Sequence, residues 1–163
     1  MLKKIVLIFI AGVIFAWQSF AGNANALSLS EEVRTIPLNE AGETITLSNP
    51  EALKGSRLFV SNCAQCHIQG KTKTNPNVSL SKDALANALP ARDNLEGLMD
   101  YIEHPTSYDG EEDLTLLHLN TERPDLWPEI RNYSEDDIKA VAGHILIQAF
   151  SDPKWGNLSL IDN

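Results

Sequence analysis

The chain has 163 residues but only two cysteines, Cys63 and Cys66. Two thiols are too few for a small domain stapled by disulfides, and too few for an all-cysteine zinc or iron–sulfur site. Basic residues are also scarce, because 13 lysines and arginines stand against 22 aspartates and glutamates and give a formal net charge of −9. A surface of this sign repels phosphate backbones, so nucleic acid is not an expected partner.

The sequence also lacks an apolar run long enough to span a bilayer. The longest run, Ile5–Ala16, has twelve residues, whereas a spanning helix needs about 20. It follows Lys3 and Lys4 and precedes Ala24-Asn25-Ala26, the small-x-small pattern that a signal peptidase reads. We therefore expect residues 1–26 to be a signal peptide that is removed, with an uncleaved membrane anchor as the alternative. Its removal would take away two lysines and no acid, which leaves an exported chain of net charge −11.

The remaining residues, 27–163, are expected to form one globular domain that begins with a β-hairpin over residues 34–48. Two β-prone runs, Thr35–Leu38 and Thr44–Leu47, flank a short polar turn that contains a glycine. Pro37 in the first run predicts an edge strand. A lone hairpin is only marginally stable, so this one must pack against helices.

The rest of the chain predicts a mainly α fold with four helices. The first starts behind Asn49 as N-cap, with Pro50 at its first position, and runs toward Cys63. The others are expected over Ser81–Leu89, from Asp93 as N-cap to Pro105, and from Ser134 to Phe150. Between the third and the fourth lies the segment 105–132, which has three prolines and no clear period. So long a loop in a small domain indicates a functional role.

The sequence Cys63-Ala64-Gln65-Cys66-His67 has the spacing of c-type haem attachment. Two thiols on one helical turn can each add to one vinyl group of a haem, and His67 is then held beneath the ring with a nitrogen toward the iron. The alternatives are a redox dithiol of the thioredoxin type, which normally opens a helix after a strand, and a structural zinc site, which lacks a second ligand pair here. Because the motif closes a helix instead, it favours one covalently attached haem c.

Gly55 and Phe59 precede the motif at a spacing that, in small c-type cytochromes, lets the first helix cross closely over the last. Gly143 in the last helix is the expected matching small residue. The alternative is an incidental helix glycine, which costs about 1 kcal/mol relative to alanine.

Four residues compete to bind the other face of the iron, and the choice affects its potential, since methionine raises it and paired histidines lower it. Met99 lies on the apolar stripe of the third helix, which indicates core packing. His144 lies roughly 130° from the apolar stripe of the last helix, at 100° per residue, so a surface or partner-facing role is expected. His104 ends the third helix, where a cation is favourable. His118 lies among four leucines of the long loop, an environment that would cover an iron and exclude water, and is favoured.

Several segments outside the motif carry a specific resemblance. They are Thr72–Pro76, Arg92-Asp93-Asn94 with Glu96-Gly97-Leu98, Pro105–Gly110, the isolated His118, Ala142–Leu146 and Lys154-Trp155-Gly156. Together with the motif they resemble, over nearly all of the mature chain, the PsbV family, the extrinsic cytochromes c-550 of photosystem II in cyanobacteria and some algal plastids. The chain departs from the family pattern at Leu119, where proline is common, and in a tail after Gly156 that is not rich in glycine and tyrosine.

The resemblance implies a small c-type cytochrome fold in which Cys63 and Cys66 bind haem c covalently. It also implies that His67 and His118 are the axial ligands of a low-potential iron with no open position. The expected role is that of a non-enzymatic lumenal subunit of photosystem II, peripheral to the thylakoid membrane. The expected partners are the photosystem II core and the other extrinsic subunits, and the expected effect is to support the manganese–calcium cluster and its retention of calcium and chloride. The alternative is a diffusible electron carrier of the lumen or periplasm.

Overall fold

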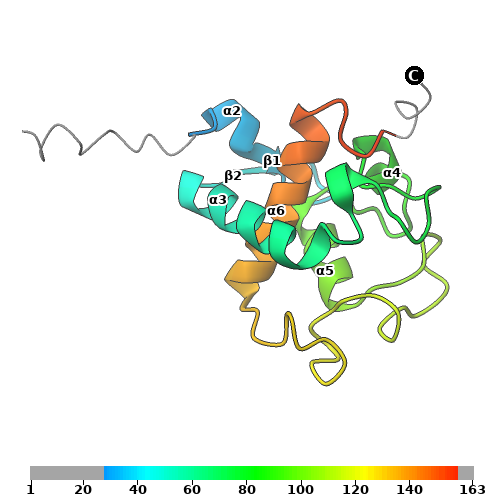
Figure 1. Cartoon of the computed structure of the whole chain (residues 1–163). Helices are drawn as coiled ribbons and strands as arrows, with labels where there is room; N and C mark the ends of the chain where they lie inside the picture. The colour runs from blue at the N-terminus through cyan, green and yellow to red at the C-terminus, as the bar shows by residue number, and fades with distance from the viewer. Residues whose placement is uncertain (1–27, 158–163) are drawn as a thin grey trace, which may run out of the picture.

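The protein is mainly helical and carries a short antiparallel hairpin, as predicted (Figure 1). The computed structural model describes residues 28–157, so the expected signal peptide, residues 1–26, lies outside the described residues. The elements are α2 (Glu31–Arg34), β1 (Thr35–Pro37), β2 (Thr44–Thr46), α3 (Asn49–Leu58), α4 (Lys82–Ala86), α5 (Leu95–Glu103) and α6 (Glu135–Ser151). Helices α3 to α6 are the four that the sequence predicts, whereas the single turn of α2 was not predicted. None of the described helices combines the length and the apolar character that a membrane span requires.

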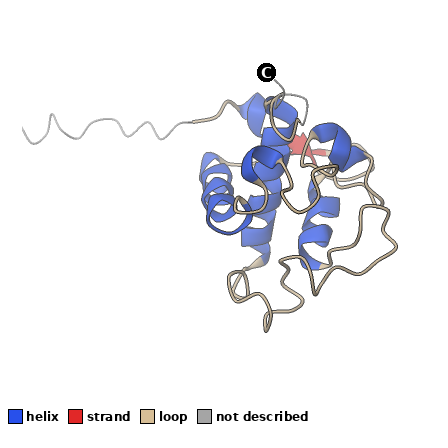
Figure 2. Ribbon diagram, turned by 45° about the vertical axis from the view of Figure 1, so that its right-hand side comes forward, coloured by secondary structure: helices blue, strands red, loops and turns tan. Residues whose placement is uncertain are grey.

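Helix α6 runs through the middle of the molecule and forms its core. In Figure 1, α3 crosses in front of it, and in Figure 2 the other helices and the hairpin surround it. It begins as predicted at Ser134, whose hydroxyl accepts a hydrogen bond from Asp137 N, while the Asp137 carboxylate accepts from Ser134 N at 2.8 Å. Neighbouring elements cover this helix on several sides. Nine of its residues are therefore buried, and only the half-buried Lys139 interrupts the run: Ile138, Ala140, Val141, Ala142, Gly143, His144, Ile145, Leu146 and Ile147.

Gly55 lets α3 approach the backbone of α6, which confirms the predicted crossing. A Cβ at position 55 would lie 1.9 Å from the carbonyl oxygen of Ala140, far inside van der Waals contact. Gly143 is not the matching residue, and that expectation is wrong. A Cβ at position 143 would instead lie 2.3 Å from Leu47 Cδ1, because this glycine receives the hairpin. Two different glycines therefore admit two different elements to the central helix.

The helix boundaries differ from the predicted ones by a few residues. Ser48, not Asn49, caps α3, because Ser48 and Glu51 form a reciprocal capping box. Asn94, not Asp93, caps α5, since its side chain accepts a hydrogen bond from Gly97 N. Helix α4 ends at Ala86 rather than Leu89. At the starts of α3 and α5, both neighbouring residues have a side chain suited to capping, and only the hydrogen bond in the folded structure decides between them.

His144 is buried, so the predicted surface or partner-facing role for it is wrong. Its imidazole packs against Phe59, with ring centroids 5.2 Å apart, and edge-on against Trp155 at 6.1 Å. The apolar stripe of α6 does not define its buried side, because α3 and the C-terminal segment cover the residues beside that stripe. Burial lowers the pKa of His144 to about 4.

This burial predicts a specific acid sensitivity. The unfolded chain takes up a proton on His144 near pH 6.5 but the folded chain only near pH 4, so stability falls as the pH drops through that interval. Between pH 7 and pH 4.5 the wild type should therefore lose about 2 kcal/mol more unfolding free energy than His144→Leu. Guanidinium unfolding at the two pH values measures the difference. Equal losses in the two proteins would show that His144 is not buried in its neutral form.

Candidate haem-binding site

The two cysteines and His67 are brought together at the end of α3 by an irregular turn. Residues Phe59–Cys63 form a π-helical turn in which Ala64 N donates to Phe59 O at 2.9 Å. The chain then tightens, and the N–H groups of both Cys66 and His67 donate to the carbonyl of Cys63, at 3.1 and 2.9 Å. Such π-turns occur often at functional sites. The three residues of the motif are thus held on one turn, as the attachment of a haem requires.

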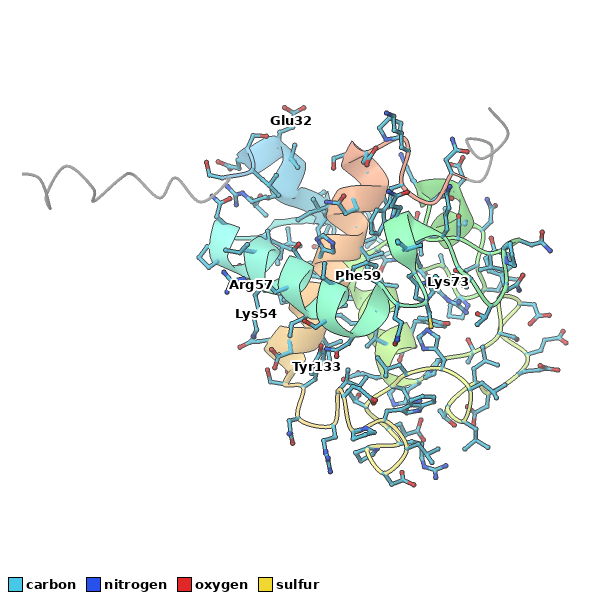
Figure 3. The ribbon with its side chains drawn as sticks, viewed as in Figure 1. Glu32, Lys54, Arg57, Phe59, Lys73 and Tyr133 are labelled. Atoms are coloured by element: carbon cyan, nitrogen blue, oxygen red, sulfur yellow. The ribbon has the colours of Figure 1, made fainter. Side chains whose placement is uncertain are left out.

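Phe59 fixes the start of this turn to the core. It is buried, and its ring packs against the rings of His144 and Trp155, so α3, α6 and the C-terminal segment meet at this one side chain. Figure 3 shows Phe59 where α3 passes in front of α6, with Tyr133 lower down. Asn62, one residue before the motif, donates to the Tyr133 hydroxyl. The motif therefore lies on a rigid element and not on a free loop.

His67 and His118, which are 51 positions apart in the sequence, face each other in the structure. Their ring centroids are 6.1 Å apart and the rings are inclined by 54°. A metal–imidazole bond is about 2 Å long, so two such bonds account for about 4 Å of this separation. The remaining distance is close to twice the distance from the centre of an imidazole ring to its ligating nitrogen. The geometry fits two imidazoles on opposite sides of one iron.

In both histidines the hydrogen bond is made by Nδ1. The Nδ1 atom of His67 lies 3.2 Å from the Thr72 hydroxyl, and the Nδ1 atom of His118 lies 2.9 Å from the carbonyl oxygen of Leu119. Since a carbonyl only accepts, His118 carries its hydrogen on Nδ1 and presents the lone pair of Nε2. Within residues 28–157, neither Nε2 atom has a hydrogen-bond partner. Each ring thus offers one nitrogen to a metal, and the other is fixed by a neighbour, as is usual for ligating histidines.

Burial keeps both imidazoles neutral. It lowers the pKa of His67 to about 4, with a smaller effect from nearby His118, and it also lowers the pKa of His118. A neutral imidazole is the form that binds a metal. Burial likewise raises the pKa of the Cys63 thiol to about 11. A redox dithiol needs the opposite shift, so this alternative reading of the motif is disfavoured.

His118 is positioned by the long segment between α5 and α6. This segment is tied to itself by an isolated bridge between Thr106 and Asp113 and by a turn in which Leu117 N and His118 N both donate to Leu114 O at 2.8 Å. In Figure 2 it appears as the run of loops along the lower part of the molecule. The functional role that its length indicated is consistent with this placement of His118.

Two residues near His118 were missed by the sequence analysis as parts of the site. The ring centroid of Tyr101 lies 5.1 Å from that of His118, and the Arg92 guanidinium lies over the Tyr101 ring, 3.9 Å from its centroid. Arg92 is buried and donates to the carbonyl oxygens of Thr106 and Ser107. Tyr101 follows Leu98 by three residues, a spacing that places the two side chains on the same face of a helix. This spacing was the signal in the sequence that could have identified Tyr101.

The other candidate ligands lie elsewhere. Met99 packs against the core from α5. His104 follows α5, remains exposed and pairs with Asp100 at 3.3 Å. His144 lies in the core between Phe59 and Trp155. Of the four residues considered, the structure brings only His118 to face His67.

The surroundings of the motif and of His118 suit a large apolar cofactor. Four side chains next to these residues in the sequence remain more than half exposed: Val60, Ile68, Leu116 and Leu117. A haem that covered them would remove apolar surface from water. Within residues 28–157, no three His, Cys, Asp or Glu side chains gather into a metal-ion site, so the structural zinc alternative has no ligand set. The residues present therefore fit a haem.

Comparisons with known proteins identify the family of the chain. The family model described as the cytochrome c-550 domain matches residues 27–161. The chain is 51% identical over 155 residues to photosystem II extrinsic protein V of Synechocystis sp., an alignment that covers 95% of this chain and 97% of that protein. It is 56% identical over 130 residues to the protein of the same name from Microcystis aeruginosa, covering 80% and 96%. The crystal structure of cytochrome c549 matches with a TM-score of 0.75 at 48% identity, covering 78% of this chain and 99% of that one. The chain therefore belongs to the cytochrome c-550 family, as its motifs predicted.

Proposed function

We propose that the mature chain, residues 27–163, carries one haem c, bound through thioether bonds to Cys63 and Cys66, with His67 and His118 as the axial ligands. The single observation that supports this most strongly is the 6.1 Å separation of two half-buried, facing imidazoles from distant parts of the chain. When bound, the haem supplies a reversible one-electron couple of the iron. The protein's own residues set the conditions for that couple.

Those residues favour a low potential and a closed iron. Two imidazoles stabilise the ferric state more than a histidine and a methionine do, so the potential is lower than in most cytochromes c. The hydrogen bonds of Nδ1 with Thr72 and Leu119 fix the orientation of each ring. With both axial positions filled by the chain, no site is left for oxygen, which disfavours an oxygen-activating enzyme.

At the level of assembly, we propose an extrinsic lumenal subunit of photosystem II, peripheral to the thylakoid membrane. Relatives that cover almost the whole chain bear the name photosystem II extrinsic protein V, and this supports the proposal. The partners would be the photosystem II core and the other extrinsic subunits. In that position the chain stabilises the manganese–calcium cluster and helps it retain calcium and chloride.

The ligand assignment predicts the effect of removing one imidazole. His118→Ala should leave haem attachment intact, because both thiols remain, but convert the six-coordinate low-spin ferric haem to a high-spin or water-ligated form. Absorption spectra of the purified ferric proteins measure this conversion, which should be complete.

Met99→Leu is the matched control, since it changes an apolar neighbour of the core and should leave the spectrum unchanged. An unchanged spectrum for His118→Ala together with an altered one for Met99→Leu would exchange the two roles and refute the assignment.

The assembly proposal predicts where the protein is found in a cell. When expressed in a cyanobacterium that lacks its own extrinsic cytochrome c-550, the chain should sediment with thylakoid membranes at low salt. At about 1 M salt, where the Debye length is only about 3 Å, it should be released. Adding it back to washed membranes should lower the calcium and chloride needed for oxygen evolution. Recovery only in the soluble fraction at low salt would favour the diffusible carrier instead.

A further inference from the structure

The side chain of Asn120 is the most completely buried polar group in the described part of the chain, with 0% of its surface exposed. It lies in the long segment between α5 and α6, two residues after His118. An amide buried so deeply costs free energy unless its hydrogen bonds are made. Nothing in the sequence pattern or in the ligand assignment accounts for its position.

The hydrogen bonds of this amide all go to the backbone around His118. Nδ2 donates both of its hydrogens, one to the carbonyl oxygen of His118 at 2.6 Å and one to that of Thr115 at 2.8 Å. Oδ1 accepts from the backbone N–H of Arg123 at 2.9 Å. One side chain thus joins the residues before His118, His118 itself and the residues after it.

A second side chain is hydrogen-bonded to the same loop. Trp127 Nε1 donates to Thr115 O at 3.0 Å, so this carbonyl receives two side-chain donors. The segment from Thr115 to Trp127 is therefore held by side-chain-to-backbone hydrogen bonds in place of a helix or sheet ladder.

These contacts lead to the imidazole. Asn120 fixes the carbonyl of His118, and hence the peptide plane that leads into Leu119. The carbonyl of Leu119 in turn accepts the Nδ1–H of His118, which sets the ring's tautomer and its angle. Without the Asn120 amide, the His118 carbonyl and the Arg123 N–H would be left unpaired, and the His118 peptide would be free to rotate. The carbonyl of Thr115 would keep only its bond from Trp127.

We propose that Asn120 is a positioning residue for the distal axial ligand: it holds His118 on the iron by fixing the loop from which the imidazole projects. The inference rests on the proposed ligation of the iron by His118. Loss of the amide makes dissociation of His118 easier while His67 and the thioether bonds stay in place.

Cyanide measures this dissociation, because it binds the ferric iron only when His118 has left it. The apparent affinity for cyanide is therefore proportional to the fraction of protein in which His118 has left the iron. In the holoprotein at pH 7, Asn120→Ala should raise the apparent cyanide affinity about tenfold or more, a factor that corresponds to about 1.4 kcal/mol. Asn120→Asp, which keeps the size and the acceptor but loses both donated hydrogen bonds, should act in the same direction and serves if the alanine variant does not fold.

Asn94→Ala is the matched control. Asn94 is also a buried asparagine, 4% exposed, that caps α5, so its loss lowers the unfolding midpoint without touching the His118 loop. Its cyanide affinity should stay within about twofold of the wild type. A rise in affinity for Asn94→Ala as large as that for the Asn120 variants, or no rise for the latter, overturns the inference. If His118→Ala itself binds cyanide no better than the wild type, the ligand assignment fails instead, and the two failures are thereby distinguished.

Discussion

The separation of the His67 and His118 rings is the constraint on which the rest of the structure depends. Two neutral, half-buried imidazoles 6.1 Å apart are held in a partly apolar setting, where each has lost part of the water that would otherwise solvate it. Burial of this kind is unfavourable unless a partner satisfies the remaining nitrogen. An iron bound between the rings, as proposed above, would be such a partner, and the hydrogen bonds of the two Nδ1 atoms leave both Nε2 atoms available for it.

The two halves of the site are held by different physical means. His67 belongs to a turn that continues α3, and α3 is locked to α6 by backbone contact at Gly55 and by the aromatic packing of Phe59 with His144 and Trp155. Steric packing at native density permits little movement there. His118 stands on a loop with no regular structure, held by individual hydrogen bonds. It is therefore the ligand whose position depends on single polar side chains.

This difference also explains how much could be predicted from the sequence. The attachment motif, the hairpin, the four helices and the Gly55 crossing follow local spacing rules, and the structure contains each of these elements. His144 was misjudged because a helical wheel measures distance from an apolar stripe, whereas α6 is enclosed by several elements at once. Gly143 was paired with the wrong element for a similar reason, since many partners fit a small residue. The contacts of Tyr101 and Asn120 join residues through the tertiary fold of a loop without periodicity, and no local pattern encodes them.

The measurement that tests the central claim most directly is a redox titration of the purified mature protein followed by low-temperature electron paramagnetic resonance. It reports the axial ligands and the potential of the iron together. We predict a single one-electron transition, at a potential below that of histidine–methionine cytochromes c, and a ferric low-spin signal typical of two imidazole nitrogens. A signal typical of a sulfur ligand opposite the imidazole, a high-spin ferric signal, or a preparation without haem from cells competent in haem attachment would contradict it.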